Sequence, residues 1–335
     1  MRAKGDRGRG ATVPQDIPPV GWWDVAVRVK GDIARDNVSL VSAGLSMWAL
    51  LSVFPALTAA VSVYGLFETP AGVVQQLSVL SAILPPGVWH LFEQQLQDVA
   101  TRAGGSLTLA ALVSLLIALW SARSGMSSLM TATNIAYREH EKRGLLKQFG
   151  LSLLFTLGAV VGLLVFLALL LVVPVALDIL GTGGWVQVAA EVLRWLLLWG
   201  FAVLGLAILY RFAPAREQAR WHWVSSGSLI AATLWLASSA LFALYVRSFA
   251  NFQKAYGALG SVIVLLLWFY LSSFFVVLGA EINAELERQT KLDTTTGLPE
   301  PLGSRGAYVP DTVGPTAEKA LQRQRQGSER SAHTV

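Results

Sequence analysis

The side chains that most often carry out catalysis are scarce in this chain and do not cluster along it. Its 335 residues include no cysteine and four histidines, at His90, His140, His222 and His333. None of these histidines stands in an HxH or HExxH pattern, the spacing expected of neighbouring metal ligands. The chain also lacks a GxxxxGK phosphate-binding loop. The sequence therefore predicts no enzyme activity, no metal site and no cofactor.

The remaining polar candidates stand near the ends of long apolar runs, and they are Arg123, Asn134, Arg211, Glu281 and Asn283. Polar and ionisable groups at the edge of a membrane either pair structurally and reach toward the interface, or they form a functional site. The functional interpretation is a polar site that opens toward the cytoplasm. In the structural interpretation Glu281 pairs with Arg211 or Arg123, because a guanidinium stabilises a buried carboxylate.

A second candidate is an uncharged pocket between helices. Ser52, Pro55 and Ala56 would line it from one apolar run, and Asn251 and Tyr256 would line it from the segment before another. Pro55 frees a backbone carbonyl, which is tolerated inside a membrane only where protein or water satisfies it. Such a pocket suits a lipid-like ligand better than an ion, since no ring of central charges is present. Plain helix packing along the small residues explains the same pattern.

Six apolar runs must position these residues. The chain is 54% hydrophobic and 14% charged, with a mean hydropathy of +0.53, whereas soluble domains carry about 25% charged residues. A helix of about 20 apolar residues is long enough to cross a bilayer. We therefore expect an all-α, polytopic membrane domain over residues 37–288. Its six transmembrane helices are predicted at about 38–67, 106–122, 145–177, 192–212, 223–246 and 259–280.

The segments outside these runs are polar or amphipathic. Residues 1–20 and 289–335 are rich in polar residues, glycine and proline, and both are predicted to be disordered cytoplasmic tails. The connection 68–105 holds two stretches with apolar residues at helical spacing, which predicts two amphipathic helices that cap the bundle or lie in the outer interface.

Residues 21–36 predict a further amphipathic helix. One face carries Trp22, Ala26, Val29 and Ile33, while charged residues such as Arg28 lie on the other side. An apolar face of this kind is typical of an interfacial helix on the inner membrane surface. A short helix that packs on the bundle would show the same pattern.

Lysine and arginine are distributed unevenly between the segments that separate the runs. When Lys147 and Arg211 at the ends of their runs are counted with the adjoining connections, the segments before, between and after the six runs hold 7, 1, 5, 0, 3, 2 and 7 of these residues, in chain order. Because positively charged connections stay on the cytoplasmic side, this alternation predicts six crossings with both termini in the cytoplasm.

The stretch from Val246 to Leu286 carries a family resemblance. Its elements are Phe249, Asn251, Tyr256-Gly257, Gly260, Leu265-Leu266-Leu267-Trp268, Tyr270-Leu271-Ser272, Gly279-Ala280-Glu281 and Asn283-Ala284. Together with upstream segments at Asp36 to Phe67 and Leu119 to Tyr137, and with Tyr210-Arg211, they resemble the YihY/BrkB family. These are bacterial inner-membrane proteins formerly mislabelled ribonuclease BN. The resemblance implies a six-span fold in the plasma (inner) membrane rather than an activity.

Two classes of function fit this pattern. The first is a membrane protein that handles or transports an amphipathic or lipid-like substrate, with membrane lipids as its partners. The alternative is a structural or partner-binding protein without transport, whose partner is a second copy or another membrane or envelope protein. Ribonuclease activity is disfavoured because no metal ligands cluster. Nucleic acid is not expected as a partner, because the basic residues flank the apolar runs as membrane topology requires.

Overall fold

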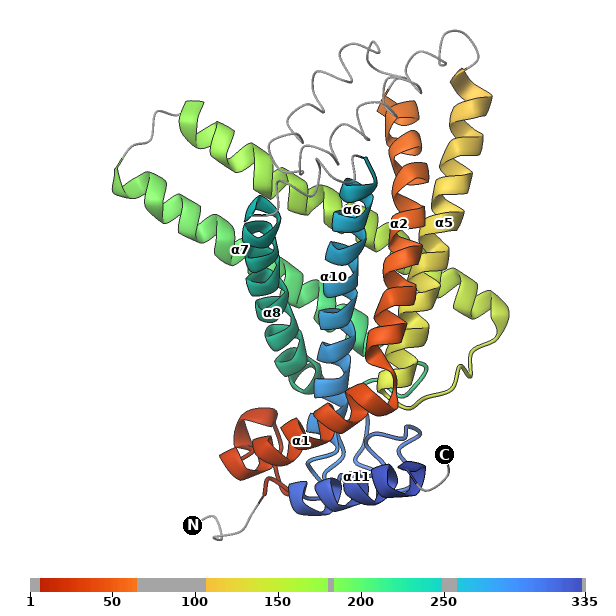
Figure 1. Ribbon diagram of the computed structural model, residues 1–335, viewed down its shortest axis with the longest axis vertical. Coiled ribbons are helices and arrows are strands. Elements are labelled where there is room, and N and C mark those ends of the chain that lie inside the picture. Colours follow the sequence, from red (N-terminus) through yellow and green to blue (C-terminus); the bar gives the residue numbers. More distant parts are fainter. Residues whose placement is uncertain (1–6, 65–106, 180–183, 249–257, 333–335) are drawn as a thin grey trace.

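The computed structural model describes residues 7–64, 107–179, 184–248 and 258–332 (Figure 1). These residues are helical or irregular, and within them the only β pairing is an isolated bridge between Ala219 and Thr295. The all-α class predicted from the sequence is therefore confirmed for the described chain.

Long helices lie where the apolar runs predict them. Over the described residues there are six: α2 (Val38–Tyr64), α5 (Leu107–Ala136), α6 (Leu145–Ile179), α7 (Trp185–Phe212), α8 (Trp221–Ser248) and α10 (Ala258–Glu287). Helices α5 and α10 continue well beyond the predicted ends of their runs. Their last turns are polar, so apolar run length alone underestimates them.

The surface of these helices fits a membrane environment. Among the described residues, four stretches are long and apolar enough to cross a bilayer, and α2 adds the shorter apolar stretch Val38–Ser52. The four are Leu145–Gly162, Trp185–Phe212, Trp221–Val246 and Val262–Glu287. Large apolar side chains on them stay exposed, and Leu146 of α6 reaches 90% exposure. A wide exposed apolar surface on long helices is expected where lipid replaces water.

Helix α10 occupies the centre of the bundle. It packs against α2, α5 and α8, while α7 packs on α8 and α6 contacts both α5 and α7. Figure 1 shows α2, α5, α8 and α10 running side by side, with α6 and α7 crossing them obliquely. The last turns of α10 therefore face several neighbours at once.

Residues 7–37 and 288–332 fold together at one end of the bundle, and we call this unit the terminal cap (Figure 1). It contains a short 3₁₀ helix (Pro14–Asp16), α1 (Pro19–Arg35) and α11 (Ala317–Ala332). The Arg9 guanidinium ties its two halves together by donating hydrogen bonds to the carbonyls of Arg288, Gln289 and Gly314, at 3.3, 3.2 and 2.7 Å.

The prediction that both tails are disordered is thus wrong for residues 7–20 and 289–332. Their composition is polar, but each tail satisfies the backbone groups of the other. Lys291 donates its backbone N–H to the carbonyl of Arg9 at 2.9 Å, and the Thr290 hydroxyl donates to that of Ala11 at 2.8 Å. Polar, proline-rich segments are ordered when such partners exist.

Helix α1 packs on the bundle through both faces: Val29, Trp22 and Ile33 of its apolar face join the cluster around Trp223 and Leu286, and its charged face is covered as well. Asp24, Arg28 and Asp32 are buried, whereas Trp23 is 63% exposed. Asp24 accepts the backbone N–H of Ala317 at 2.7 Å, which places a carboxylate at the N-terminus of α11, where the helix dipole favours it. The sequence predicts these charged residues on the helix side opposite the apolar face, and the structure buries both. The alternative prediction, a short helix that packs on the bundle, agrees with the contacts of α1 with α10 and α11. The amphipathic helices predicted within 68–105 lie outside the described residues.

Candidate functional site

The junction between the bundle and the terminal cap holds the densest set of buried polar contacts in the described chain. It is built mainly on the last turns of α10. Three groups meet there: the amide of Asn283, the glycines that bring helices together, and the carboxylates Glu281, Glu285 and Glu287.

Asn283 joins α10 to α8 through the backbone. Its side-chain oxygen accepts the N–H of Gly227 at 2.7 Å, and its side-chain nitrogen donates to the carbonyl of Val224 at 3.0 Å. The amide is fully buried, and both of its functions are satisfied. The role that the contacts support is therefore to fix the register of two helices.

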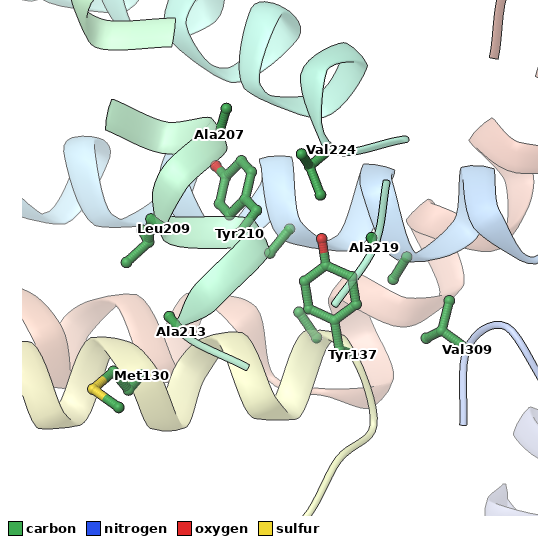
Figure 2. Close-up of a cluster of buried hydrophobic side chains, with 12 residues drawn as sticks. Met130, Tyr137, Ala207, Leu209, Tyr210, Ala213, Ala219, Val224 and Val309 are labelled. Atoms are coloured by element: carbon green, nitrogen blue, oxygen red, sulfur yellow. The ribbon is translucent and has the colours of Figure 1, made fainter. Parts of the chain in front are cut away.

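Two glycines allow α7, α8 and α10 to approach closely. A Cβ atom on Gly279 would lie 2.3 Å from the Tyr210 hydroxyl oxygen and 2.6 Å from the Ala231 Cβ, and one on Gly227 would lie 2.4 Å from the carbonyl oxygen of Gly279. The Tyr210 hydroxyl in turn donates to the carbonyl of Val276 at 2.7 Å. Figure 2 shows Tyr210 and Tyr137 at the middle of this buried cluster. Small residues at such contacts are typical of helix packing in membranes.

Glu287 forms a bidentate ion pair with Arg216, which lies in the connection after α7. Two guanidinium nitrogens of Arg216 lie 2.6 and 3.1 Å from the carboxylate oxygens, and neither side chain has any exposed surface. The guanidinium carbon also lies 4.3 Å from the centre of the Tyr137 ring. Thr294 donates its hydroxyl to Glu287 at 2.8 Å. Breaking such a pair would leave a buried charge uncompensated.

Glu285 joins α10 to the terminal cap through arginines. Arg28 of α1 donates its Nε to the carboxylate and its Nη2 to the Glu285 carbonyl at 2.9 Å, and Arg288 donates to the same carboxylate. The Nη2 of Arg138 lies 3.5 Å from Glu285 and 3.1 Å from Asp32. We call Arg28, Asp32, Arg138, Glu285 and Arg288 the cap joint.

Asp32 is the acidic group that α1 contributes to the cap joint. Burial and the neighbouring Glu285 carboxylate raise the pKa of Asp32 to about 7, although Arg138 and Arg35 act in the opposite direction. The two carboxylates tolerate each other because guanidinium groups lie between and beside them. The cap joint is thus a network of buried and partly buried charges in which each carboxylate has a guanidinium partner.

The predicted ion pair of Glu281 with Arg211 or Arg123 is wrong. Glu281 is fully buried, but neither of its oxygens accepts a hydrogen bond from the described residues. Arg211 instead lies over the Trp221 ring at 4.4 Å, and Arg123 donates to Ser152 at 3.1 Å and lies over the Phe149 ring at 4.4 Å. Both arginines therefore lie at contacts between neighbouring helices, Arg211 between α7 and α8 and Arg123 between α5 and α6.

Asn134 lies at a different contact, between α5 and the connection after α7. At the end of α5 its side-chain oxygen accepts the N–H of Ala215 at 2.7 Å, and its nitrogen donates to Glu141 at 3.2 Å. The five polar residues predicted as one site are therefore distributed over separate helix contacts. In the described contacts each serves a local structural purpose, with the exception of Glu281.

The predicted pocket is described only at Ser52. Its hydroxyl donates to the carbonyl of Trp48 at 2.7 Å and would lie 3.7 Å from a Cβ atom on Gly125 of α5. Ser52 therefore lies at the contact between α2 and α5. The side chains of Pro55 and Ala56, and Asn251 and Tyr256 altogether, lie outside the described residues.

Sequence reasoning did not identify Arg28, Asp32, Arg138, Arg216 or Glu287 as junction residues. One available signal was the spacing of Asp24, Arg28 and Asp32, which recur every four residues and so form one charged stripe. A second was the presence of carboxylates in the last turns of an apolar run, which require partners.

The fold and the junction define an all-helical integral membrane protein whose buried charges gather at one end. The comparisons with known proteins identify its family. The family described as virulence factor BrkB matches residues 29–301. The chain therefore belongs to the BrkB/YihY family, as its motifs had indicated.

Several relatives support this assignment. The chain is 33% identical over 266 residues to the "putative ribonuclease-like protein YfkH" of Bacillus subtilis, a match that covers 75% of this chain and 90% of that protein. It is 28% identical over 280 residues to the "UPF0761 membrane protein PBPRA3489" of Photobacterium profundum, covering 83% and 84%. A UPF0761 membrane protein of Alkalilimnicola ehrlichii is 28% identical over 297 residues, and the chain spans 63% of its length. No solved structure matches this chain.

Replacing Gly279 with alanine should lower the melting temperature of the purified protein. The added Cβ would collide with Tyr210 and Ala231, and overpacking of this kind costs about 1–3 kcal/mol. Gly205→Ala in α7 is the matched control, because nothing lies within 4 Å of its Cβ position and alanine favours helix. Equal melting temperatures for the two variants would contradict the close-packing interpretation.

Proposed function

We propose that this protein crosses the bacterial plasma (inner) membrane six times, with both termini and the terminal cap in the cytoplasm. The positions of the long helices and the alternation of lysine and arginine between them support this topology. In this arrangement α1 lies at the inner membrane surface, and its exposed Val20 and Trp23 reach toward the lipid headgroups.

Reporter fusions test this topology. Fusions after Glu68, Gly183 and Asn251 are expected to report the periplasmic side, because an odd number of crossings precedes each of them. Fusions after Arg143 and Glu217 serve as internal controls and should report the cytoplasm. A cytoplasmic signal from the Gly183 fusion would remove one crossing and contradict the six-span arrangement.

Within this topology we propose that the protein handles or transports an amphipathic or lipid-like substrate. The observation that carries the proposal is the separation of charge from the apolar surface. Every buried charged side chain of the described residues belongs to the junction, the terminal cap or the connection between α5 and α6. Apart from the partly buried Arg123, Glu191, Arg194 and Arg211, the rest of the described bundle offers mainly apolar and hydroxyl groups, which suit acyl chains better than a desolvated ion.

The proposal includes no catalytic reaction, no cofactor and no nucleic-acid partner. Its support is that the described residues contain no group of three or more histidine, aspartate or glutamate side chains placed to hold a metal ion. The name of the Bacillus relative describes that protein as ribonuclease-like. At the junction, the carboxylates of Glu285 and Glu287 are engaged by arginines, and Glu281 is fully buried away from solvent, so none is placed to act on a soluble RNA.

Lipid retention measured by native mass spectrometry tests the substrate class. Ser52→Leu, or Ala56→Leu beside it, should weaken lipid retention if a pocket adjoins this face of α2. Gly44→Leu is the control on the same helix, because its Cβ position meets nothing within 4 Å. Size-exclusion chromatography would check that the variants remain folded. Unchanged retention in well-folded Ser52 and Ala56 variants would leave plain helix packing as the better explanation.

The alternative is a structural or partner-binding role for a second copy or another envelope protein. The ordered terminal cap favours it, because α1 presents an exposed stripe of Val20, Trp23 and Ala26. Under this alternative, lipid retention would not respond to substitutions at Ser52, whereas replacement of Trp23 would abolish association with the partner.

A further inference from the structure

A groove lies between the connection after α5 and the C-terminal part of the terminal cap. Its volume is about 530 Å³, and its lining includes Arg138, His140 and Lys142 on one side and Gly306, Tyr308 and Asp311 on the other. We propose that this groove binds a phosphate-bearing anion. None of the residues predicted from the sequence to form a site takes part in it.

The two carboxylates that line the groove are already occupied. Glu139 accepts the backbone N–H of Tyr308 at 2.6 Å and the ammonium of Lys142 at 2.8 Å. Asp311 accepts the N–H groups of Gly303 and Arg305 at 2.7 and 3.1 Å. These hydrogen bonds hold the acidic groups in place and so shape the groove. Arg138 is tied to Asp32 and Glu285 of the cap joint, so the donors left for a ligand come mainly from Lys142 and His140.

Three basic side chains enter the groove from one short segment. Lys142 keeps 59% of its side chain exposed, so its ammonium has donors left beyond the contact with Glu139. His140 is exposed and lines the groove. Arg138 donates to the Tyr308 hydroxyl at 3.3 Å. Convergent ammonium, imidazole and guanidinium donors are the groups that recognise phosphate oxygens.

The opposite wall is aromatic side chain and backbone. The Tyr308 ring lies near two guanidinium groups, with the Arg138 carbon 5.4 Å and the Arg288 carbon 5.8 Å from its centre. Gly303 and Gly306 both have positive φ, at 97° and 70°, and carry no side chain that would fill the groove. A flat aromatic wall and bare backbone suit a compact tetrahedral anion beside a larger substituent.

Two sources of such an anion fit the position of the groove. One is free phosphate or a soluble phosphate ester. The other is the headgroup of an anionic lipid, since α6 begins three residues after Lys142 with Leu145 and Leu146, which are 85% and 90% exposed. Basic residues directly beside exposed apolar ones are typical of contact with lipid headgroups. The inference does not depend on substrate handling by the bundle, because its residues lie outside the helix interior.

Binding measurements on the full-length protein in detergent test the inference. One arm titrates inorganic phosphate by isothermal calorimetry, and the other counts retained phosphatidylglycerol against phosphatidylcholine by native mass spectrometry. The groove variant is His140→Gln with Lys142→Gln, which removes one lysine charge and one imidazole donor. The charge-matched control is Lys319→Gln on the exposed side of α11. Loss of the ammonium and of the imidazole donor should weaken binding about tenfold or more in the groove variant and leave it unchanged in the control.

The two arms separate the sources. Saturable phosphate binding that the groove variant loses supports a free anion, and selective loss of phosphatidylglycerol supports a lipid headgroup. Absence of binding in both arms, or an equal loss in the control variant, would overturn the proposal. If the double variant fails to fold, Lys142→Gln alone serves as the test, because that side chain is mostly exposed, and unchanged binding in it would count against the groove.

Discussion

The structure depends on one electrostatic constraint, which is that the buried carboxylates at the end of α10 need cationic partners. An unpaired charge in a buried position costs several kcal/mol, whereas a paired and hydrogen-bonded one is tolerated. Glu285 and Glu287 are both essentially inaccessible to solvent. Their arginine partners come from α1, from the connection after α5 and from the connection after α7. The terminal cap is ordered around α10 because it supplies these partners.

Close packing on another part of α10 sets the geometry of those pairs. Gly279 and Gly227 bring α10 and α8 into backbone contact, and Asn283 then fixes their register through two hydrogen bonds. With the rotation of α10 fixed in this way, Glu285 points toward α1 and Glu287 toward Arg216. The Gly-Ala-Glu and Asn-Ala elements of the family resemblance thus have a physical explanation in helix packing. Glu281 is the residue of this segment for which the described contacts supply no partner.

The sequence predicts the long helices well and the junction poorly, for reasons that are physical. Apolar run length is a local property, so the positions of α2 and α6 to α8 follow from it directly. Ion pairing depends on the rotation of helices about their axes, which no local pattern specifies. The partners predicted for Glu281, Arg211 and Arg123, therefore lie at the correct end of the bundle but at contacts between other helices. For α1, the spacing of Asp24, Arg28 and Asp32 indicates a charged face, but not that this face is buried together with the apolar one. The order of both tails arises from hydrogen bonds between residues about 280 positions apart, such as that from Thr290 to Ala11.

Hydrogen exchange of the terminal cap tests the central claim most directly. Arg28 contacts Glu285 and also donates to the carbonyl of Pro315 at 3.0 Å, so Arg28→Met leaves Glu285 without its main partner from α1. Loss of one partner of a buried pair costs about 3–5 kcal/mol. Residues 305–320 should therefore exchange more than tenfold faster in Arg28→Met. Adding Glu285→Gln should restore part of the protection, and Lys30→Met, on the exposed side of α1, should change nothing. Unaltered protection of residues 305–320 in Arg28→Met would contradict the dependence of the terminal cap on the α10 carboxylates.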